Sequence, residues 1–501
     1  MTESTKKEDP KTKNAPPKPD FLSPEFIEKA KKIREERKEK KRLQANEKKN
    51  NIDPRLQFIK RPMLDIPGQT SDGGVEITIM SYNILAQALI RRKLFPTSGN
   101  ALKWSNRSQV LLSEFKYYDS DILCLQEVDF IQYNSFWKLE FKNLGYLSQY
   151  YRADSKNHGV AIFFKSEKFA FQHSSFINYD KEKTGNVRPT AITRNVGMLV
   201  YLQFSEKLRK QYPNLTREGI IVGTTHLFWH PYGTAERTRQ TCVVLQQMKE
   251  FTRILNVLYG AEKRFYRFFA GDFNSQPYDS PYLSITAKPT TYTDRAKNVI
   301  GRSLAHQWDE SKEVKEDEGP EDEDKDKDKE DEQEVKDGTT KEIEGEADED
   351  RKEADIDVED SPVPKTFKFS PEVLQKIQAM EDLHNNLDMR AISLYSVGYH
   401  LVHKENAGLD NERNEPFFSN WAHAWRGLLD YIFVVSDWDK QESFANKVDS
   451  LEQLERDNHV KLLSLLRLPT PNEMGPEPSG QPRTGQYPSD HLCIIAKIEL
   501  C

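Results

Sequence analysis

The chain has 501 residues, enough for about two to four average domains or for one large domain with disordered segments. Only 36% of the residues are hydrophobic and the mean hydropathy is −0.78, so part of the sequence is expected to lie outside any core. No apolar run reaches the roughly 18 residues that cross a bilayer, and the N-terminus lacks the apolar segment of a signal peptide. We therefore expect an intracellular protein with no membrane contact.

The N-terminal 72 residues are predicted to be a basic and largely disordered arm. Ser23-Pro24-Glu25 is a plausible helix start, and a highly charged helix would follow it. Its apolar stripe is short, which favours a solvated helix without a packing partner. A contact with RNA or a role in nuclear import is the alternative.

From Val75 onward, short runs rich in Val, Ile, Phe and Tyr predict β-strands. These runs are VEITIMSYNIL, DSDILCLQEVD, HGVAIFFK, GMLVYLQF, GIIVGTTHLFW, YRFFAGDFN, LLDYIFVVS and HLCIIAKIEL. Amphipathic helices are predicted over 104–117 and 234–259, and a third is predicted to begin at Ser370. This alternation indicates one layered α/β domain over 73–501.

One segment interrupts that domain. Residues 309–360 contain 28 acidic and 9 basic residues and no aromatic residue, so they cannot bury enough apolar surface to fold. We predict a disordered acidic insert over 309–365, and the simplest interpretation is an inert, solubilising linker; the alternative is that its charge competes with RNA for a basic face. Because the whole chain carries −7 and 309–360 carries −19, the remainder carries +12, which suits a polyanionic partner.

Side chains able to bind metal or phosphate stand at or beside the ends of six predicted strands. They are Asn83, Glu127, His226, Asp272 with Asn274, Asp430, and Asp490 with His491. Any one of them has an ordinary explanation, because strand ends are solvated, and Asp272 and Asn274 beside Gly271 are also typical of a turn. Six such ends, all carboxylate, carboxamide or imidazole, form a set that a sheet can gather at one edge.

The ordered motifs SYNIL, LQEVD, THLFWHP, GDFNS, LDYIF and SDH resemble the endonuclease/exonuclease/phosphatase superfamily of magnesium-dependent phosphodiesterases. Residues 104–129, 158–169 and 228–241 are similar to the deadenylase and nocturnin branch. The sequence contains no leucine-rich repeats, so the likeness is greatest to the fungal Ngl-type RNA exonucleases. The resemblance implies an α/β (α+β) fold, a four-layer α/β sandwich with two central mixed β-sheets flanked by helices.

The resemblance also implies roles for the strand-end residues. Glu127 would bind Mg²⁺, with Mn²⁺ as the alternative ion, and Asn83 would orient Glu127 or the phosphate. Asp490 would serve a second metal. Asp272 would orient or deprotonate the attacking water.

Four further residues would act on the phosphate or support it. Asn274 would hold the scissile phosphate, and His226 would contact it. Asp430 and His491 would form a carboxylate–imidazole pair, in which His491 acts either as a base or as an electrostatic stabiliser.

The resemblance to the deadenylase branch further implies base recognition by Trp425, which would stack on a nucleobase, and by Pro231, which would pack on the same base. A buried core position is the alternative for Trp425. The sequence departs from the family at His230, where Asp is usual, so adenine preference stays open.

These expectations favour a monomeric Mg²⁺-dependent 3′→5′ exoribonuclease that trims single-stranded RNA, either poly(A) tails or ribosomal RNA precursors, and releases 5′-nucleotides. It would act in the nucleus, including the nucleolus, or in the cytoplasm. The alternative enzyme is a phosphatase for a small phosphorylated metabolite or dinucleotide. A non-catalytic RNA-binding or scaffold protein is disfavoured, because Glu127, Asp272 and His491 are all present.

Overall fold

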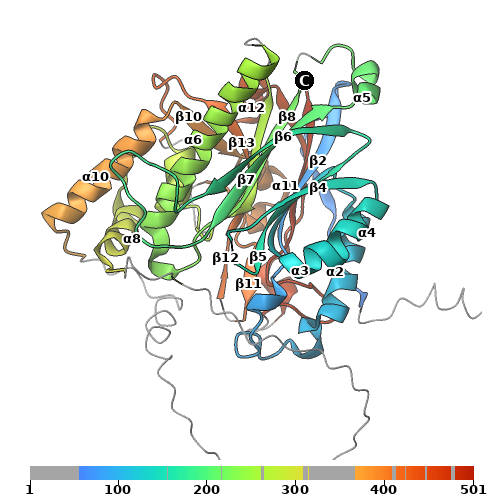
Figure 1. Cartoon of the computed structure of the whole chain (residues 1–501), viewed down its shortest axis with the longest axis horizontal. Helices are drawn as coiled ribbons and strands as arrows, with labels where there is room; N and C mark the ends of the chain where they lie inside the picture. Colours follow the sequence, from blue (N-terminus) through green and yellow to red (C-terminus); the bar gives the residue numbers. More distant parts are fainter. Residues whose placement is uncertain are drawn as a thin grey trace, which may run out of the picture. The chain divides into compact units, whose positions relative to one another are not determined.

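Two mixed β-sheets form the centre of the domain (Figure 1). The computed structural model describes residues 56–308, 314 and 367–501, apart from 155, 216, 261–263, 409–412, 424, 446–447 and 476–479. The charged N-terminal helix and nearly all of the acidic insert lie outside the described residues.

The first sheet has seven strands in the order β1-β14-β15-β2-β3-β5-β4. Its strands are β1 (Met63–Asp65), β14 (Val460–Leu466), β15 (Ile494–Leu500), β2 (Val75–Asn83), β3 (Ile122–Asp129), β5 (His158–Lys165) and β4 (Tyr146–Tyr151). Only β2 and β3 run parallel, and the other neighbours are antiparallel.

The second sheet has six strands in the order β10-β13-β9-β8-β7-β6. Its strands are β10 (Met389–Ser393), β13 (Asp430–Asp437), β9 (Tyr266–Asp272), β8 (Gly219–His226), β7 (Val196–Phe204) and β6 (Phe169–Asn178). Only β8 and β9 run parallel in this sheet. A separate hairpin consists of β11 (Asn420–Ala422) and β12 (Trp425–Gly427).

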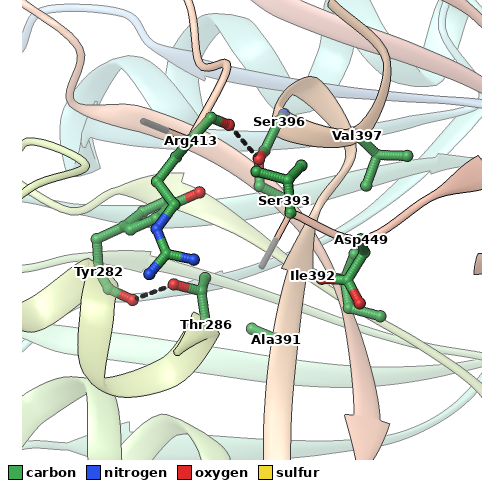
Figure 2. Close-up of a pocket in the computed structure, with 10 residues that line it drawn as sticks. Tyr282, Thr286, Ala391, Ile392, Ser393, Ser396, Val397, Arg413 and Asp449 are labelled. Atoms are coloured by element: carbon green, nitrogen blue, oxygen red, sulfur yellow. Dashed lines mark hydrogen bonds between the residues drawn. The ribbon is translucent and has the colours of Figure 1, made fainter. Parts of the chain in front are cut away.

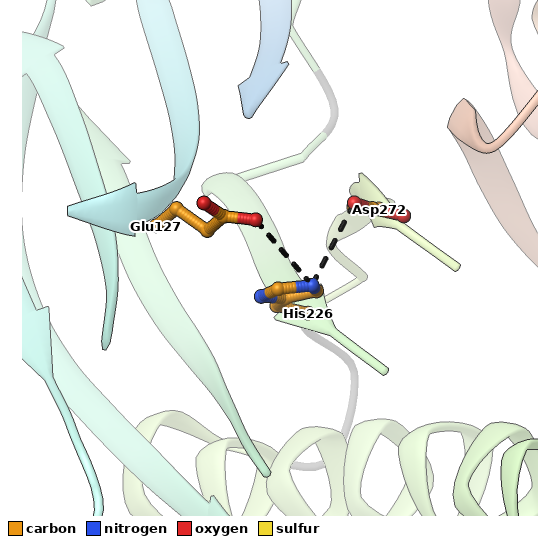
Figure 3. Close-up of side chains that lie close together, drawn as sticks. All are labelled: Glu127, His226 and Asp272. Atoms are coloured by element: carbon orange, nitrogen blue, oxygen red, sulfur yellow. Dashed lines mark ion pairs between the residues drawn. The ribbon is translucent and has the colours of Figure 1, made fainter. Parts of the chain in front are cut away.

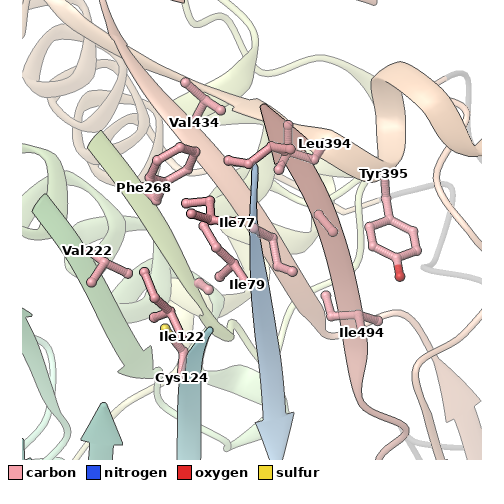
Figure 4. Packing of buried hydrophobic residues seen from close by; sticks show 14 of the residues in the cluster. Ile77, Ile79, Ile122, Cys124, Val222, Phe268, Leu394, Tyr395, Val434 and Ile494 are labelled. Atoms are coloured by element: carbon pink, nitrogen blue, oxygen red, sulfur yellow. The ribbon is translucent and has the colours of Figure 1, made fainter. Parts of the chain in front are cut away.

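The two sheets pack face to face through aliphatic side chains (Figure 4). Ile79 and Ile122 from the first sheet meet Val222 and Phe268 from the second, and all four are fully buried. The side chains that alternate with these along the strands are apolar too, so the outer face of each sheet also needs a cover.

Helices provide that cover on both sides (Figure 1). Val243 and Met248 of α6 (Thr234–Tyr259) pack on the second sheet, and Phe115 of α2 (Trp104–Tyr118) packs on the first. The longer helices on the side of the second sheet also include α8 (Asp294–Ala305) and α10 (Pro371–Asn386). The domain is therefore the expected four-layer α/β sandwich.

Shorter helical segments connect these layers. They are η2 (Gln87–Leu89), η3 (Gly99–Leu102), α3 (Phe130–Gln132), η4 (Tyr133–Trp137), α4 (Lys138–Asn143), α5 (Glu206–Gln211), η5 (Pro231–Gly233), α7 (Ser280–Thr286), α11 (Leu394–Val402), η6 (Lys404–Asn406), α12 (Leu451–Asn458) and α13 (Pro471–Met474). Within the described part of the chain, no helix is both long enough and apolar enough to span a bilayer.

The domain begins earlier than residue 73. Met63–Asp65 pairs with β14, Ile66 is part of the core, and the buried Arg61 donates to the carbonyl of Cys493 at 2.8 Å. The expected boundary at residue 72 is therefore too late, because a strand of three residues has too few alternations to register as a pattern.

A cavity of about 10 Å³ lies beside α7, β10 and α11 (Figure 2). Tyr282, Ser393, Ser396 and Arg413 contribute to its lining, and none of the predicted site residues does. That volume holds about one water molecule, so we do not regard the cavity as a substrate site.

Candidate active site

The predicted strand-end residues meet at one edge of the two packed sheets. Asn83 and Glu127 lie at the carboxyl ends of the parallel strands β2 and β3. His226 and Asp272 end the parallel strands β8 and β9 and are paired in register. Asp430 begins the antiparallel strand β13 and stands opposite Asp272.

Glu127, His226 and Asp272 form a compact group across the two sheets (Figure 3). His226 Nε2 lies 3.9 Å from Glu127 Oε1 and 3.7 Å from Asp272 Oδ2. The facing atoms of the three residues all lie within 4.8 Å of one another. The side chains of Glu127 and His226 are 11% and 8% exposed, so the group is enclosed yet reachable from solvent.

Asn83 holds the two carboxylates of this group together. Its Nδ2 donates to Glu127 Oε1 at 2.8 Å and to Asp272 Oδ2 at 2.9 Å. Its Oδ1 accepts from the amide of Leu85 at 3.0 Å, which sets the orientation of the carboxamide. Asn83 thus turns its nitrogen, not its oxygen, toward the group and orients Glu127.

The backbone of Glu127 has an unusual conformation. Its φ is +54°, and the pairing of β3 with β5 shifts register between Leu125 and Val128. A bulge of this kind re-aims a side chain, and a left-handed conformation costs a non-glycine residue about 1–2 kcal/mol. The amide of Ala86 donates to Glu127 Oε2 at 2.9 Å and fixes the carboxylate that the bulge presents.

Asp272 both makes a turn and faces the site. Its Oδ1 accepts from the amide of Asn274 at 2.8 Å, while its Oδ2 faces Asn83 and His226. Asn274 has φ +44°, and its Nδ2 donates to the carbonyl of Leu227 at 3.0 Å. The turn at this strand end therefore positions the carboxylate and does not exclude a functional role for it.

Asp430 and His491 form the expected buried pair. His491 Nδ1 lies 2.7 Å from Asp430 Oδ2, and its Nε2 lies 3.5 Å from Asp272 Oδ2. Ser419 also donates to Asp430 Oδ2, at 2.7 Å. Burial lowers the pKa of His491, but the facing carboxylates of Asp430 and Asp272 outweigh it and hold this pKa well above its usual value.

Asp490 lies beside this set but belongs to neither close group. It accepts from Ser489 Oγ at 3.3 Å and from Asn420 Nδ2 at 3.4 Å. Burial raises the pKa of Asp490, and the carboxylate of Glu127 contributes to the rise while His491 opposes it. Among the described residues, the two groups with ligand-like spacing are Glu127, His226 and Asp272, and Asp272, Asp430 and His491.

The donor atoms at this edge fit a small divalent cation. Each Mg–O bond is about 2.1 Å long, so two oxygens that share one ion lie up to about 4.2 Å apart. Glu127 Oε1 and Asp272 Oδ2 accept from the same Asn83 nitrogen, and one carboxylate oxygen of each residue lies within 4.8 Å of the other, near that limit. Small rotations of the two side chains would let them share an ion.

The two residues expected to bind a base follow or precede strands that reach this edge: Pro231 lies in the segment after β8, and Trp425 in the hairpin before β13. Trp425 is in the β11–β12 hairpin, and its ring lies so close over Gly427 that a Cβ there would be 2.9 Å from it. Trp425 is half-buried and belongs to none of the described core clusters, so the core alternative does not hold. Pro231 is half-buried and begins η5, five residues after His226.

Three supporting residues escaped the sequence analysis. Buried Arg107 donates to the carbonyls of Leu85 at 2.6 Å and Pro488 at 2.8 Å, and so ties together the loops that carry Ala86 and His491. Gln126 Nε2 donates to Thr224 Oγ1 at 2.9 Å and links the two sheets directly beneath the site. The third is Ser419, described above. Arg107 could have been found, because a charged residue on the core-facing side of a predicted helix indicates a buried polar contact. Nothing in the sequence pattern marks Gln126 or Ser419.

The chain is similar to several known proteins. Residues 80–302 match the model of the Endonuclease/Exonuclease/phosphatase family. The chain is 46% identical over 503 residues to RNA exonuclease NGL2 of Saccharomyces cerevisiae, covering 99% of this chain and 92% of that protein. It is 35% identical to the probable RNA exonuclease NGL3 of the same yeast, covering 95% of this chain and 90% of that protein. Among solved structures, the human Nocturnin catalytic domain with bound sulfate matches at 19% identity and a TM-score of 0.46, covering 89% of this chain and 99% of that one.

Proposed function

Because this chain belongs to the endonuclease/exonuclease/phosphatase family, we propose that it is a Mg²⁺-dependent 3′→5′ exoribonuclease that releases 5′-nucleotides from single-stranded RNA. The match to an RNA exonuclease over nearly the whole length of both chains carries the proposal. The polar edge of the two sheets supports it, because every predicted strand-end residue lies at or beside that edge. The net charge of +12 outside the acidic segment suits a polyanionic substrate.

Glu127 and Asp272 are the residues that would hold the metal. Their oxygens face each other across one Asn83 amide, and the bulge at Glu127 keeps its carboxylate pointed at the site despite the strained backbone. Strained backbone conformations of this kind cluster at active sites and ligand-binding sites. When bound, Mg²⁺ neutralises charge on the phosphoryl oxygens and on the leaving oxygen.

Asp272 is also placed to orient the attacking water. Its Oδ2 faces His226 and His491, while its Oδ1 is committed to the turn. Burial raises the pKa of Asp272, Asp430 adds to the rise, and the imidazole of His491 opposes it. A carboxylate at this position can accept a hydrogen bond from the attacking water and so orient it.

His491 would act as an electrostatic stabiliser of the phosphate. Its Nδ1 is bound to Asp430, so the other nitrogen, Nε2, points toward Asp272 and the polar edge. The carboxylates that raise the pKa of His491 favour the protonated imidazole, which suits donation to a phosphate oxygen and not removal of a proton. His226 and Asn274 line the same edge and would contact the remaining phosphate oxygens.

The direct test is a time course on 5′-labelled single-stranded RNA with Mg²⁺, read as a product ladder on a denaturing gel. One RNA ends in a poly(A) tract, one has mixed sequence, and a DNA oligonucleotide is the control. We expect a ladder that shortens from the 3′ end, stops on addition of EDTA and resumes with excess Mg²⁺.

Glu127→Gln keeps the shape of the side chain and removes its charge. We expect this variant to lose at least about 100-fold in kcat/KM, equivalent to about 2.7 kcal/mol, while its melting temperature stays near that of the unaltered protein. Glu250→Gln, on the exposed face of α6, is the matched control and should cleave normally. Full turnover by Glu127→Gln with Mg²⁺ present would refute the metal assignment, and intact RNA throughout would redirect the work to small phosphorylated substrates.

A further inference from the structure

Four half-buried rings gather just beyond the active-site edge, in a part of the sequence with no role in the proposed chemistry. They are His230, Tyr232, His306 and Trp308. His230 and Tyr232 flank Pro231, whereas His306 and Trp308 follow α8 and precede the acidic segment. The cluster thus joins two stretches of chain that are about 75 residues apart in sequence.

The rings contact one another closely. Tyr232 and His306 are stacked, with centroids 4.7 Å apart and planes 3° from parallel. Trp308 packs edge-to-face against His306 at 4.5 Å and against His230 at 4.9 Å. These separations lie within or near the range at which aromatic pairs attract, so the four rings form one unit.

The cluster is held in place by buried polar groups of two helices. Arg237 of α6 donates to the carbonyls of Phe228 at 2.9 Å and His230 at 2.7 Å. Ser303 of α8 donates to the carbonyl of Tyr232 and accepts from the amide of Ala235 at 2.9 Å. Two helices therefore fix the backbone beneath the rings, and the four residues that carry the rings are half-buried.

The cluster lies close to the chemistry. The carbonyl of Leu227 accepts from Asn274, and His230 follows only three residues later. Three extended residues span at most about 11 Å, so His230 lies within that distance of Leu227. The same chain segment supplies Pro231 between two rings of the cluster.

Composition sets the cluster apart from the protein's own cores. The core clusters are built mainly from Ile, Val, Leu and Phe. The four half-buried rings are instead two His, one Tyr and one Trp, and the buried Phe228 lies behind them, with ring centroids 5.5 Å from Trp308 and 6.0 Å from His230. Such rings combine a flat π-face with a polar edge, as a nucleobase does, and they serve proteins that bind single-stranded nucleic acid as stacking platforms.

We propose that His230, Tyr232, His306 and Trp308 form a stacking platform for a second nucleobase of the RNA, separate from the base expected at Trp425. This inference rests on the proposed exoribonuclease function. The platform also accounts for His230, where an Asp is usual in the family: an imidazole continues the row of rings toward Trp308, and a carboxylate would not.

The test measures kcat/KM on RNAs that carry a single abasic nucleotide at successive positions from the 3′ end. For the unaltered protein, we expect two sensitive positions, each about tenfold slower when the base is missing. Trp308→Ala should be about tenfold slower on intact RNA and should no longer respond to the abasic nucleotide at one of them. His306→Ala should behave similarly, and Trp425→Ala should abolish the response at the other position.

Tyr117→Ala is the control, because Tyr117 is an exposed aromatic residue at the end of α2, 48% exposed, with no predicted role at the site. A Trp308→Ala variant that matches the unaltered protein on every RNA would refute the platform. So would one that is slower on all RNAs by the same factor and keeps both sensitive positions, which indicates a purely structural role. An unaltered enzyme that degrades no RNA would instead refute the proposed function and this inference with it.

Discussion

Single side chains at the active-site edge each make two kinds of contact. Asp272 uses one oxygen for its turn and the other for the site, and Asn83 uses its carboxamide oxygen to hold a loop and its nitrogen to hold two carboxylates. Asp430 makes both of its contacts through one oxygen: Oδ2 accepts from Ser419 and from His491. A residue that fixes such an oxygen can matter for turnover without touching the substrate.

Ser419 is a positioning residue of this kind, and we expect Ser419→Ala to lower kcat by about tenfold with little change in KM. Its hydroxyl donates to Asp430 and accepts from the amides of Leu429 at 3.0 Å and Asp430 at 3.1 Å. Without it, the Asp430 carboxylate can rotate and the imidazole of His491 loses its fixed orientation. Two buried amides also lose their acceptor, so the free energy of unfolding should fall by about 1–3 kcal/mol.

Steady-state kinetics and urea unfolding of the variant separate these two effects. Ser419→Thr retains the hydroxyl and should recover most of the turnover. Ser284→Ala removes another buried serine hydroxyl, bound to the carbonyl of Ser280 at 2.6 Å and not to the site, and should cost stability without lowering kcat. Equal kcat for Ser419→Ala and the unaltered protein would contradict the positioning role.

At the scale of elements, α7 and α10 are joined by a buried lysine. Lys288 follows α7, is fully buried, and donates to the carbonyl of His384 in α10 at 2.7 Å. Burial lowers the pKa of Lys288 to about 7, with Arg390 and Lys440 contributing and Cys242 opposing. The folded protein therefore tolerates the neutral amine better than the ammonium.

We expect Lys288 to make stability depend on pH above neutrality. In the unfolded chain a lysine keeps its proton up to a pKa of about 10.4, so between pH 7 and that value unfolding takes up a proton. Below pH 7 the buried ammonium of Lys288 lowers the free energy of unfolding by its full amount, and this destabilisation decreases as the pH rises and the amine loses its proton. The free energy of unfolding should then gain up to about 1.4 kcal/mol per pH unit from this group.

Urea unfolding of the unaltered protein and of Lys288→Met at pH 6, 7.5 and 9 measures this contribution. Subtracting the two curves removes the titration of cysteines and tyrosines, which both proteins share. The difference should shift in favour of the unaltered protein as the pH rises. Parallel curves over this range would show that Lys288 keeps its proton in the fold.

Helices and strands with a clear hydrophobic periodicity or a clear cap were predictable from the sequence. Elements whose burial depends on the strands and helices packed against them were not. The helix predicted over 234–259 has the bounds of α6, and Ser370 caps α10 by accepting from the amide of Val373 at 3.2 Å. No local pattern predicts β1, β4, β6, β10, β11, β12 or β14, and three of these, β1, β11 and β12, have only three residues each. Most residues of β6 are half-buried at the edge of its sheet, so alternation is weak there.

The same limit applies to the site. The strand-end residues were predictable because local patterns show where each strand ends, and the ends of neighbouring strands gather at one edge of a sheet. Arg107 lies 381 residues from Pro488 in the sequence, and Ser419 reaches Asp430 across the β11–β12 hairpin, so only the tertiary fold brings these groups together. Tertiary contacts of this kind leave no periodic trace in a single sequence.

In the molecule as a whole, opposite charges lie in two parts of the chain: residues 309–360 carry −19 and the remainder carries +12. The two parts are joined next to Trp308, close to the active site. Trp308 contacts His230, and the acidic sequence starts at the next residue, Asp309. A polyanionic segment attached there is kept at a high local concentration beside the surface that would bind RNA. We therefore infer that it competes with the RNA backbone for the basic residues of the domain.

Replacing residues 315–360 by a Gly/Ser linker of equal length should tighten RNA binding, measured by fluorescence anisotropy of a labelled oligonucleotide. The gain should be largest near 50 mM salt, about tenfold, and should fall toward unity at 300 mM, because salt screens the competition. A second variant contains the same 46 residues in shuffled order, so its charge is unchanged and only its sequence differs. It should bind RNA like the unaltered protein if charge alone causes the competition. If the neutral linker leaves the Kd unchanged at 50 mM salt, the acidic segment does not compete with RNA, and its role is that of a spacer between α8 and α10.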